Sequence, residues 1–599
     1  MSLIFIISII FLFLSLFLPK KTNKKLNGLI SSFYILLIIF FLTSLEAFIL
    51  SYLNIKNTLF TFSLFNTLIS ATLFFTNHKK NGKKVFQKYY FDKKQIISAS
   101  IILIFCLIIG YIRFDGFTVI NYKVNDAAVH YKLSTDYNSY LKLFDKGYSD
   151  ELYNFGRTMF GYYVPCGLFM RIMPIPHYSS YDLFNTVIFA LISLGFYITC
   201  LTIKKNEKNS ILTLIVVFLY TLAYPLNYLI FGFGYLGCGI LAVNLIFLTW
   251  KFILKYENII LYIPLFLFNI GLFYSYYLFA PAVFLSEGLF MIYRFIKEKY
   301  NIKEFFRFCF LCLIVPTIFG FLYFVYNKTG SKAAINGYSI DGYSYKNLYS
   351  NFIVLTPTII YSIINKFKKK EIDFSIFFFI CLTSYIIFTL FFTESGKVSA
   401  YYFFKSYNIL WFIIYVLIYE LINHKHYNLI LKVNFGFVIV LIIAGILNID
   451  GLISKVNFNM TNSAMSKELS SIYIYNYEKF NNESKISHDE VKLISEVLKY
   501  SDKCKIKKKN DELPYINGYT QRLWFYAINK IVPSTEHKDK SPVDIFTDNV
   551  SYNSIINNKK IRCILINDDY AKEKYNNEIK YEDYNVLYEN KKGKLLIKK

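Results

Sequence analysis

Long apolar runs recur through the first 448 residues of this 599-residue chain, separated by short connections rich in lysine. A helix needs roughly 20 mostly apolar residues to cross the hydrocarbon core of a bilayer, or about 17 when it is short. On this basis we assign fourteen spans, at about 2–18, 28–52, 58–76, 96–112, 183–203, 211–228, 237–253, 259–272, 275–294, 308–326, 350–365, 372–393, 407–422 and 428–447. With 55% hydrophobic residues, the composition excludes a soluble protein of this size. The predicted fold is a polytopic α-helical membrane protein, with a tight hairpin at 271–275 between spans eight and nine.

The net charge of +26 would suit a nucleic-acid-binding protein, but its distribution argues against one, because the lysines and arginines lie in the connections between the spans. They gather in alternate connections, at 20–25, 79–94, 204–208, 251–255, 294–307, 366–370 and 425. The positive-inside rule makes these seven connections cytoplasmic. Both termini and the remaining loops then face outward from the cell membrane. We interpret the first span as a retained helix, because no basic residues precede it.

The composition changes after about residue 449, where apolar runs shorten and Lys, Asn, Asp and Glu dominate. We predict two parts, a transmembrane domain at 1–448 and an extracytoplasmic α/β domain at 449–599. Helices are expected at 487–500 and 520–531, and strands at 561–566, 585–588 and 595–597. Cys504 and Cys563 share this region and are candidates for a disulfide, or remain free thiols.

The largest loop between spans, at 113–182, contains Asp126 and His130. Two proton-handling groups four residues apart share one face of a helix, and a carboxylate at the membrane surface can act as a general base. His130 could orient that carboxylate, touch a phosphate or join a metal site. The alternative is that Asp126 only caps a helix. Asp115 and Asp136 are less favoured candidates for the role of base. An amphipathic interfacial helix is expected at 131–144, followed by a re-entrant or surface helix at 160–173.

Candidate anion-binding residues lie in the predicted outer loops. Lys397 and Lys405 flank a tyrosine-rich segment that includes Tyr402, and Arg157 lies in the large loop. An ammonium group in this position can hold a lipid-linked phosphate as a point charge. The alternative is that the lysines snorkel to the interface beside a belt of aromatic residues.

A long outer loop that carries an acidic residue, surface helices within it, many spans and an outer C-terminal α/β domain together resemble the GT-C class of integral-membrane glycosyltransferases. The resemblance covers most of the chain by architecture and Asp126 by residue. It implies a polyprenyl-phosphate-linked sugar as donor and a glycan, lipid or protein as acceptor. The outer-loop carboxylate of that class activates the acceptor or holds a metal. No second acidic residue adjoins Asp126, so we favour an inverting displacement with Asp126 as a metal-independent base and no cofactor.

The competing class is a transporter or flippase of lipid-linked saccharides, for which Glu46 and Glu287 within spans would be the residues to test. Such a protein does not require a seventy-residue outer loop or a large outer domain. A polysaccharide polymerase would carry its large loop late in the chain, whereas here it comes early. Richness in Lys, Asn and Ile is typical of AT-rich bacterial genomes and associates the chain with the cell envelope.

Overall fold

The computed structural model describes residues 1–18, 25–81, 87–139, 160–203, 210–256, 259–297, 301–326, 348–369, 372–395, 400–422, 472–480, 486–506, 512–531, 533, 561–575 and 579–599. Within these ranges, ten helical segments are long and apolar enough to cross a membrane. The protein is therefore a polytopic helical membrane protein. The predicted span at 428–447 lies outside the described residues.

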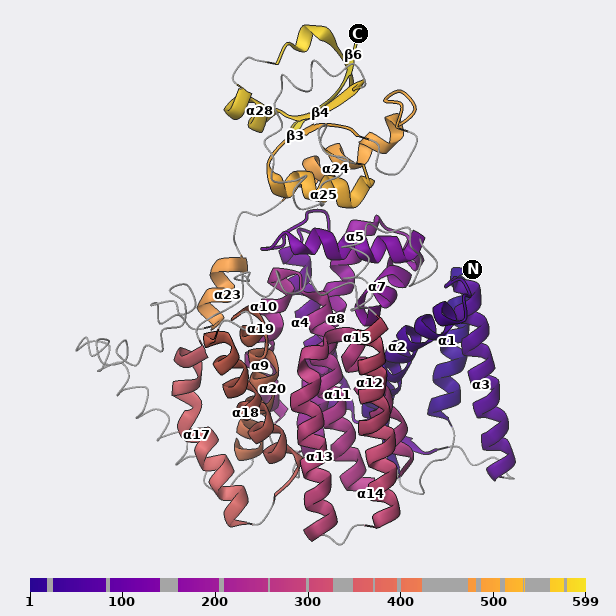
Figure 1. Cartoon of the computed structure of the whole chain (residues 1–599), viewed down its shortest axis with the longest axis vertical. Coiled ribbons are helices and arrows are strands. Elements are labelled where there is room, and N and C mark those ends of the chain that lie inside the picture. The colour runs from indigo at the N-terminus through magenta and orange to yellow at the C-terminus, as the bar shows by residue number, and fades with distance from the viewer. Residues whose placement is uncertain are drawn as a thin grey trace, which may run out of the picture.

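The helices form one bundle whose members run roughly parallel to its long axis (Figure 1). They are α1 (Ser2–Phe17), α2 (Gly28–Tyr52), α3 (Leu59–Asn81), α4 (Lys93–Arg113), α8 (His177–Ile203), α9 (Ser210–Leu222), α10 (Tyr224–Phe231), α11 (Gly234–Tyr256), α12 (Tyr262–Tyr276), α13 (Ala280–Lys297), α14 (Ile302–Phe308), α15 (Val315–Tyr326), α17 (Leu348–Lys368), α18 (Phe374–Glu394), α19 (Ala400–Lys405) and α20 (Tyr407–Ile422). A π-helical turn, Cys309–Ile314, joins α14 to α15. A short parallel pair of strands, β1 (Leu26–Asn27) and β2 (Tyr89–Tyr90), links the connections before α2 and α4.

The helices are interrupted at two places where the sequence-based expectation differs from the structure. The hairpin predicted at 271–275 is wrong, because those residues continue α12 and the break is a 3-10 turn at Tyr277–Phe279. The buried side chains of α12 keep it helical to Tyr276, whose φ of −153° ends the helix. The span predicted at 211–228 is two helices, because Ala223 leaves helical geometry and Pro225 begins the next helix near its N-terminus.

The described part of the large loop contains the helices α5 (Asp126–Ser139) and α7 (Phe160–Ile172). We expected the second of these to be a surface or a re-entrant helix. Nearly all its side chains are buried and it packs against α2, α5, α8, α11 and α12, which argues against the surface alternative. Gly161 permits this close packing, because a Cβ there would lie 2.4 Å from the ring of Tyr274 and 2.8 Å from its backbone oxygen. The helix α7 is therefore an internal support beneath α5.

The C-terminal region has a mixed four-stranded sheet in the order β3-β4-β6-β5. Its elements are α24 (His488–Glu496), β3 (Tyr515–Ile516), α25 (Tyr519–Asn529), β4 (Cys563–Asn567), α28 (Asp568–Tyr575), β5 (Tyr584–Asn590) and β6 (Gly593–Lys598). Both expected helices and all three expected strands are present, and β3 is an additional short strand parallel to β4. A disulfide joins Cys504 to Cys563. We call these elements the C-terminal unit.

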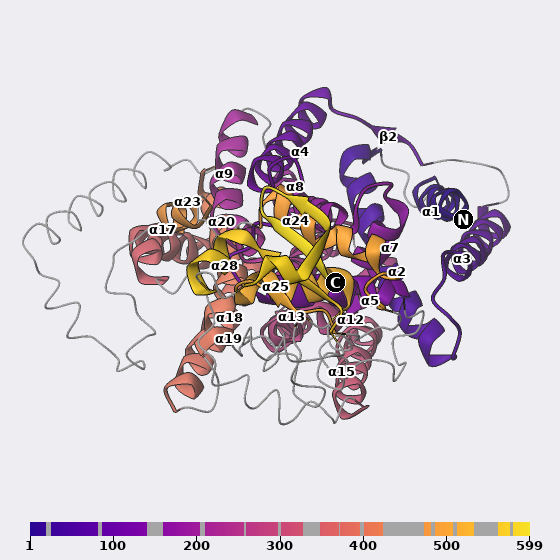
Figure 2. The same ribbon diagram turned by 90° about the horizontal axis from the view of Figure 1, so that it is seen from above.

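The C-terminal unit lies over one end of the bundle, above α5 (Figure 1), and this end is called the domain end below. Seen from above, the unit covers the middle of the bundle, whereas α1 and α3 lie side by side at one edge (Figure 2). The helix α23 (Ile472–Phe480), which precedes the unit, is tied to the bundle by Arg113, whose guanidinium donates to the carbonyls of Lys479 and Phe480. An antiparallel bridge between Ile120 and Ile486 adds a backbone link.

Candidate functional site

Asp126 is the first residue of α5 and lies at the domain end of the bundle, under the C-terminal unit. Its side chain keeps accessible surface, whereas the next two residues of the helix, Ala127 and Ala128, are fully buried. The backbone carbonyl of Ala127 accepts a hydrogen bond of 3.3 Å from the hydroxyl of Tyr181, which fixes the first turn of α5 to α8. A carboxylate at a helix N-terminus is favoured by the helix dipole. Asp126 is thus an accessible carboxylate on a firmly held turn.

Lys405 ends α19 and is directed into the protein, with only 2% of its surface exposed. Its ammonium donates a hydrogen bond of 2.6 Å to the hydroxyl of Tyr235. It also lies over three aromatic rings, at 4.3 Å from the centroid of Phe233, 4.9 Å from Tyr235 and 5.7 Å from Tyr276. The sequence left a snorkelling lysine as the alternative, but this ammonium is enclosed by aromatic faces, where cation–π attraction replaces part of its hydration.

Asp126 and Lys405, although distant in sequence, interact electrostatically across the domain end. Although Asp126 keeps exposed surface, the protein packed around it removes much of the hydration of the carboxylate and raises its pKa above the ordinary value of 3.8, and the positive charge of Lys405 opposes this rise. A raised pKa strengthens a carboxylate as a proton acceptor, and a nearby cation keeps it ionised. The protonation of Asp126 is therefore set by two opposing influences, burial and the charge of Lys405.

His130 lies one turn after Asp126 but is fully buried behind it. Its Nδ1 shares a hydrogen bond of 2.7 Å with the hydroxyl of Tyr163, and its ring centroid lies 4.7 Å from that of Tyr235. Burial, reinforced by the positive charge of Lys405, lowers the pKa of His130 to about 3. The imidazole is therefore neutral at physiological pH. Through Tyr235 it belongs to the same cluster as Lys405.

No group of three or more His, Cys, Asp or Glu side chains is placed to hold a metal ion among the residues that the structure describes. The closest acidic alternative on α5, Asp136, is fully buried between two lysines, at 2.8 Å from Lys132 and 2.8 Å from Lys530. Such a carboxylate is occupied by its ion pairs, so we assign Asp136 a structural role. Asp115 lies in a tight turn with a φ of 45°, before the segment that leads to α5.

The structure describes the side chains of only some of the predicted phosphate-binding residues. Lys397 and Arg157 lie outside the described residues. Tyr402 lies in the middle of α19, one turn before Lys405, and the structure describes its backbone only. Of the six predicted site residues, the described side chains are thus those of Asp126, His130 and Lys405, and the structure brings these three to the same end of the bundle.

The C-terminal unit covers the start of α5 through α25. Thr520 donates a hydrogen bond of 2.8 Å to the side-chain oxygen of Asn125, the residue before Asp126. The neighbouring residue Tyr519 is close enough to Asp126 for the carboxylate to raise the pKa of the phenol, although burial contributes more. The ring of Trp524 packs on Tyr131 with centroids 5.5 Å apart. The approach to Asp126 is therefore bordered by a part of the chain about four hundred residues later.

Sequence reasoning missed the aromatic and hydroxyl groups that surround Lys405 and His130. Tyr235 begins α11 after the sharp turn at Gly232, and Tyr276 ends α12. The only signal was their place at span ends, which an ordinary interfacial belt of aromatic residues shares. Tyr163 lay in a run that looked like a surface helix.

No protein-family model matches this chain, and no curated protein matches it significantly. The assignment of function therefore depends on the site itself.

Proposed function

We propose that this protein is a membrane glycosyltransferase that moves a sugar from a polyprenyl-phosphate donor to a hydroxyl group of a cell-envelope acceptor. The observation that carries the proposal is the pairing of an accessible carboxylate, Asp126, with a buried cation, Lys405, at the domain end of a polytopic bundle. This pairing provides a base for the acceptor and positive charge for a phosphate at one place.

The domain end is assigned to the extracytoplasmic face on two grounds. The Cys504–Cys563 disulfide belongs to the C-terminal unit, and disulfides persist in oxidising compartments. The lysine-rich connections join the other ends of the helices, as the positive-inside rule requires for a cytoplasmic face. A soluble nucleotide sugar is not supplied on the outer face, whereas a lipid-linked donor arrives there with its tail in the bilayer.

In the proposed reaction, the acceptor oxygen attacks the anomeric carbon while Asp126 takes the hydroxyl proton. A new bond forms between the acceptor oxygen and the anomeric carbon, and the bond from that carbon to the phosphate oxygen breaks. Polyprenyl phosphate leaves with the bonding electrons, and the sugar inverts its configuration. Lys405 offsets the negative charge that grows on the departing phosphate, and interactions that strengthen as charge develops lower the barrier.

The enclosure of Lys405 sets a condition on this mechanism. Since only 2% of the residue is exposed, direct contact with a phosphate requires displacement of one of the rings of Phe233, Tyr235 or Tyr276. Until a donor arrives, the same ammonium holds Asp126 in its charged form. Donor binding would therefore redirect Lys405 from Asp126 to the phosphate, which makes the carboxylate a stronger base when the substrate is in place.

The acceptor would approach from the side of α25, which borders Asp126 through Tyr519 and Thr520. His130 supports Asp126 from the buried side of α5, because its bond to Tyr163 fixes α5 against α7 and its ring packs on Tyr235. His130 is a positioning residue in this scheme and does not transfer protons.

A transporter of lipid-linked saccharides is the second candidate, and Glu46 is the observation that favours it. Glu46 is fully buried in α2, and neither carboxylate oxygen has a hydrogen-bond partner in the part of the chain that the structure describes. Buried carboxylates in spans often serve ion coupling. Glu287, by contrast, accepts bonds of 2.8 Å from Trp250 and 2.8 Å from Asn269, so its oxygens stabilise the packing of α13.

The test of the proposal is Asp126→Asn in purified protein in nanodiscs, supplied with a panel of short-chain polyprenyl-phosphate sugars. We expect the release of polyprenyl phosphate to fall by about 10²- to 10⁴-fold, the contribution of general base catalysis. Asp115→Asn is the matched control and should keep activity within about twofold, since exposed substitutions rarely matter. Unchanged turnover in Asp126→Asn would remove the catalytic assignment.

The transporter alternative has a separate test in liposomes. If the wild type only moves the lipid between the leaflets, and Glu46→Gln stops this movement, the protein is a transporter.

A further inference from the structure

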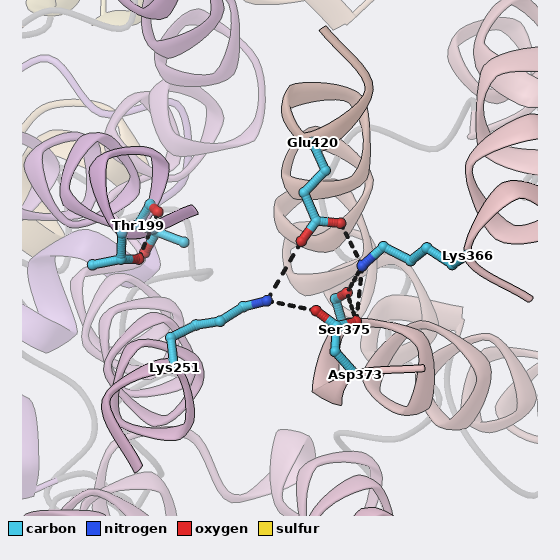
Figure 3. Close-up of polar contacts among 7 residues, drawn as sticks. Thr199, Lys251, Lys366, Asp373, Ser375 and Glu420 are labelled. Carbon is cyan, nitrogen blue, oxygen red and sulfur yellow. Dashed lines mark hydrogen bonds and ion pairs between the residues drawn. The ribbon is translucent and has the colours of Figure 1, made fainter. Parts of the chain in front are cut away.

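Four charged side chains meet at the end of the bundle opposite the C-terminal unit (Figure 3). Lys251 comes from α11, Lys366 from α17, Asp373 from the residue before α18, and Glu420 from α20. The ammonium of Lys251 lies 2.7 Å from Asp373 and 3.4 Å from Glu420, and that of Lys366 lies 2.8 Å from Asp373 and 2.6 Å from Glu420. Each lysine thus contacts both acids, and we call these four residues the charge cluster.

The charge cluster is balanced and mostly buried. Its side chains are between 10% and 27% exposed, and it holds two positive and two negative charges. Burial alone would raise the pKa of Asp373, but the two lysines outweigh it and hold that pKa well below its ordinary value. A buried charge is strongly destabilising when its partner is removed, so ion pairs of this kind hold their helices together. The cluster therefore fixes the ends of four helices against one another.

Two of these helices also carry the candidate site at their other ends. The helix α11 has Tyr235 near its start and Lys251 near its end. The span Phe403–Leu421, which contains the end of α19 and most of α20, has Lys405 near its start and Glu420 near its end. At 1.5 Å of rise per residue, the two intervals span about 24 Å and about 22 Å. The same helix pair is consequently joined twice, by Lys405–Tyr235 at the domain end and by Glu420–Lys251 at the opposite end.

We infer that Lys251 and Glu420 are positioning residues for the site, whose ion pair sets the register of α20 along α11 and so holds Lys405 against Tyr235 and near Asp126. A slip of one residue would move Lys405 by about 1.5 Å along the helix axis. That displacement is sufficient to break a hydrogen bond of 2.6 Å. The inference about register concerns the helices alone, and its consequence for the donor rests on the proposed function.

The charge cluster provides its own matched control. The double variant Lys251→Met/Glu420→Gln removes the link between α11 and α20 and leaves the Lys366–Asp373 pair. The double variant Lys366→Met/Asp373→Asn removes an equal number of charges but leaves the Lys251–Glu420 pair. Both variants keep the cluster neutral. A merely structural role would make the two equivalent, whereas register control makes only the first affect Lys405.

The experiment measures amide hydrogen exchange in the peptide that covers 400–406, and the KM for a polyprenyl-phosphate sugar, with the full chain in nanodiscs. For Lys251→Met/Glu420→Gln we expect exchange about tenfold faster and a KM about fivefold higher. The control variant should stay within about twofold on both readouts. Lys251→Arg keeps the positive charge at this position and should behave as the wild type. It therefore separates loss of the ion pair from a general effect of substituting Lys251.

The outcomes separate the two claims. Unchanged exchange in the Lys251/Glu420 variant, or equal acceleration in both double variants, overturns the inference about register. Faster exchange with an unchanged KM supports the register inference and counts against the role of Lys405 in donor binding.

Discussion

Nδ1 of His130 lies 2.7 Å from the hydroxyl oxygen of Tyr163, and both side chains are buried between α5 and α7. This bond joins the helix that carries Asp126 to its internal support. Because the imidazole is enclosed, its protonation would place an additional charge beside Lys405. The pair is therefore sensitive to pH in a defined direction.

We predict that His130 makes the fold less stable in acid. Its pKa is about 3 in the folded protein and 6.5 ordinarily, so the unfolded chain binds the additional proton between these values. Stability from this group is present above pH 6.5 and is lost as the pH falls below it, by about 1.4 kcal/mol per pH unit. Thermal unfolding at pH 7 and pH 5 should show a smaller acid effect in His130→Gln than in the wild type. An equal effect in both would show that His130 titrates normally.

The acid limb of the activity profile is predicted to depend on Lys405. Since the positive charge of Lys405 lowers the pKa of Asp126 and burial raises it, Lys405→Met removes the opposing influence. The pH below which activity is lost should then move upward, as more of the carboxylate is protonated at a given pH. Measurements of kcat/KM against pH compare the wild type with Lys405→Met. A downward shift, or none, would mean that the two groups do not interact.

The docking of the C-terminal unit is predicted to depend on Lys530. Lys530→Met should weaken it by about 1.5 to 3 kcal/mol, the value of a hydrogen bond to a charged group, because the fully buried carboxylate of Asp136 would lose one of the two lysines that lie 2.8 Å from it. Lys592→Met is the control, since its bond to Asp569 is exposed and should contribute below about 1 kcal/mol. Limited proteolysis of the two variants measures the release of the unit. Equal protection would show that the aromatic contacts of Trp524 hold the unit without the ion pair.

The sequence was informative where chemistry follows from local pattern. Hydrophobic runs of sufficient length located most of the spans, and the periodicity of 487–500 and 520–531 located α24 and α25. The spacing of Asp126 and His130 placed them on one helix. Whether Asp126 remains accessible while His130 is buried depends on the packing of α7 beneath α5, which the apolar run at 160–173 did not reveal.

Pairings between distant helices could not be predicted, because they depend on which spans are neighbours. Lys251 and Lys366 looked like ordinary residues of cytoplasmic connections, yet both are held by Asp373 and Glu420. Lys405 looked like an outer-loop lysine, but the turn at Gly232 brings Phe233 and Tyr235 around it. A one-dimensional pattern records the charge of each residue and not the partner that neutralises it.

The orientation of the bundle leads to a final prediction on intact cells. Glu582 in the C-terminal unit and Lys303 at the start of α14 are both exposed, and they lie at opposite ends of the molecule. Cysteines introduced at these positions, with the free native cysteines replaced and the Cys504–Cys563 disulfide kept, report which end faces outward. A membrane-impermeant maleimide should label Glu582→Cys in intact cells and Lys303→Cys only after permeabilisation, because the reagent cannot cross the bilayer. The reverse pattern would place Asp126 on the cytoplasmic face, where a nucleotide-linked donor is available, and would remove the main reason for a polyprenyl-phosphate donor.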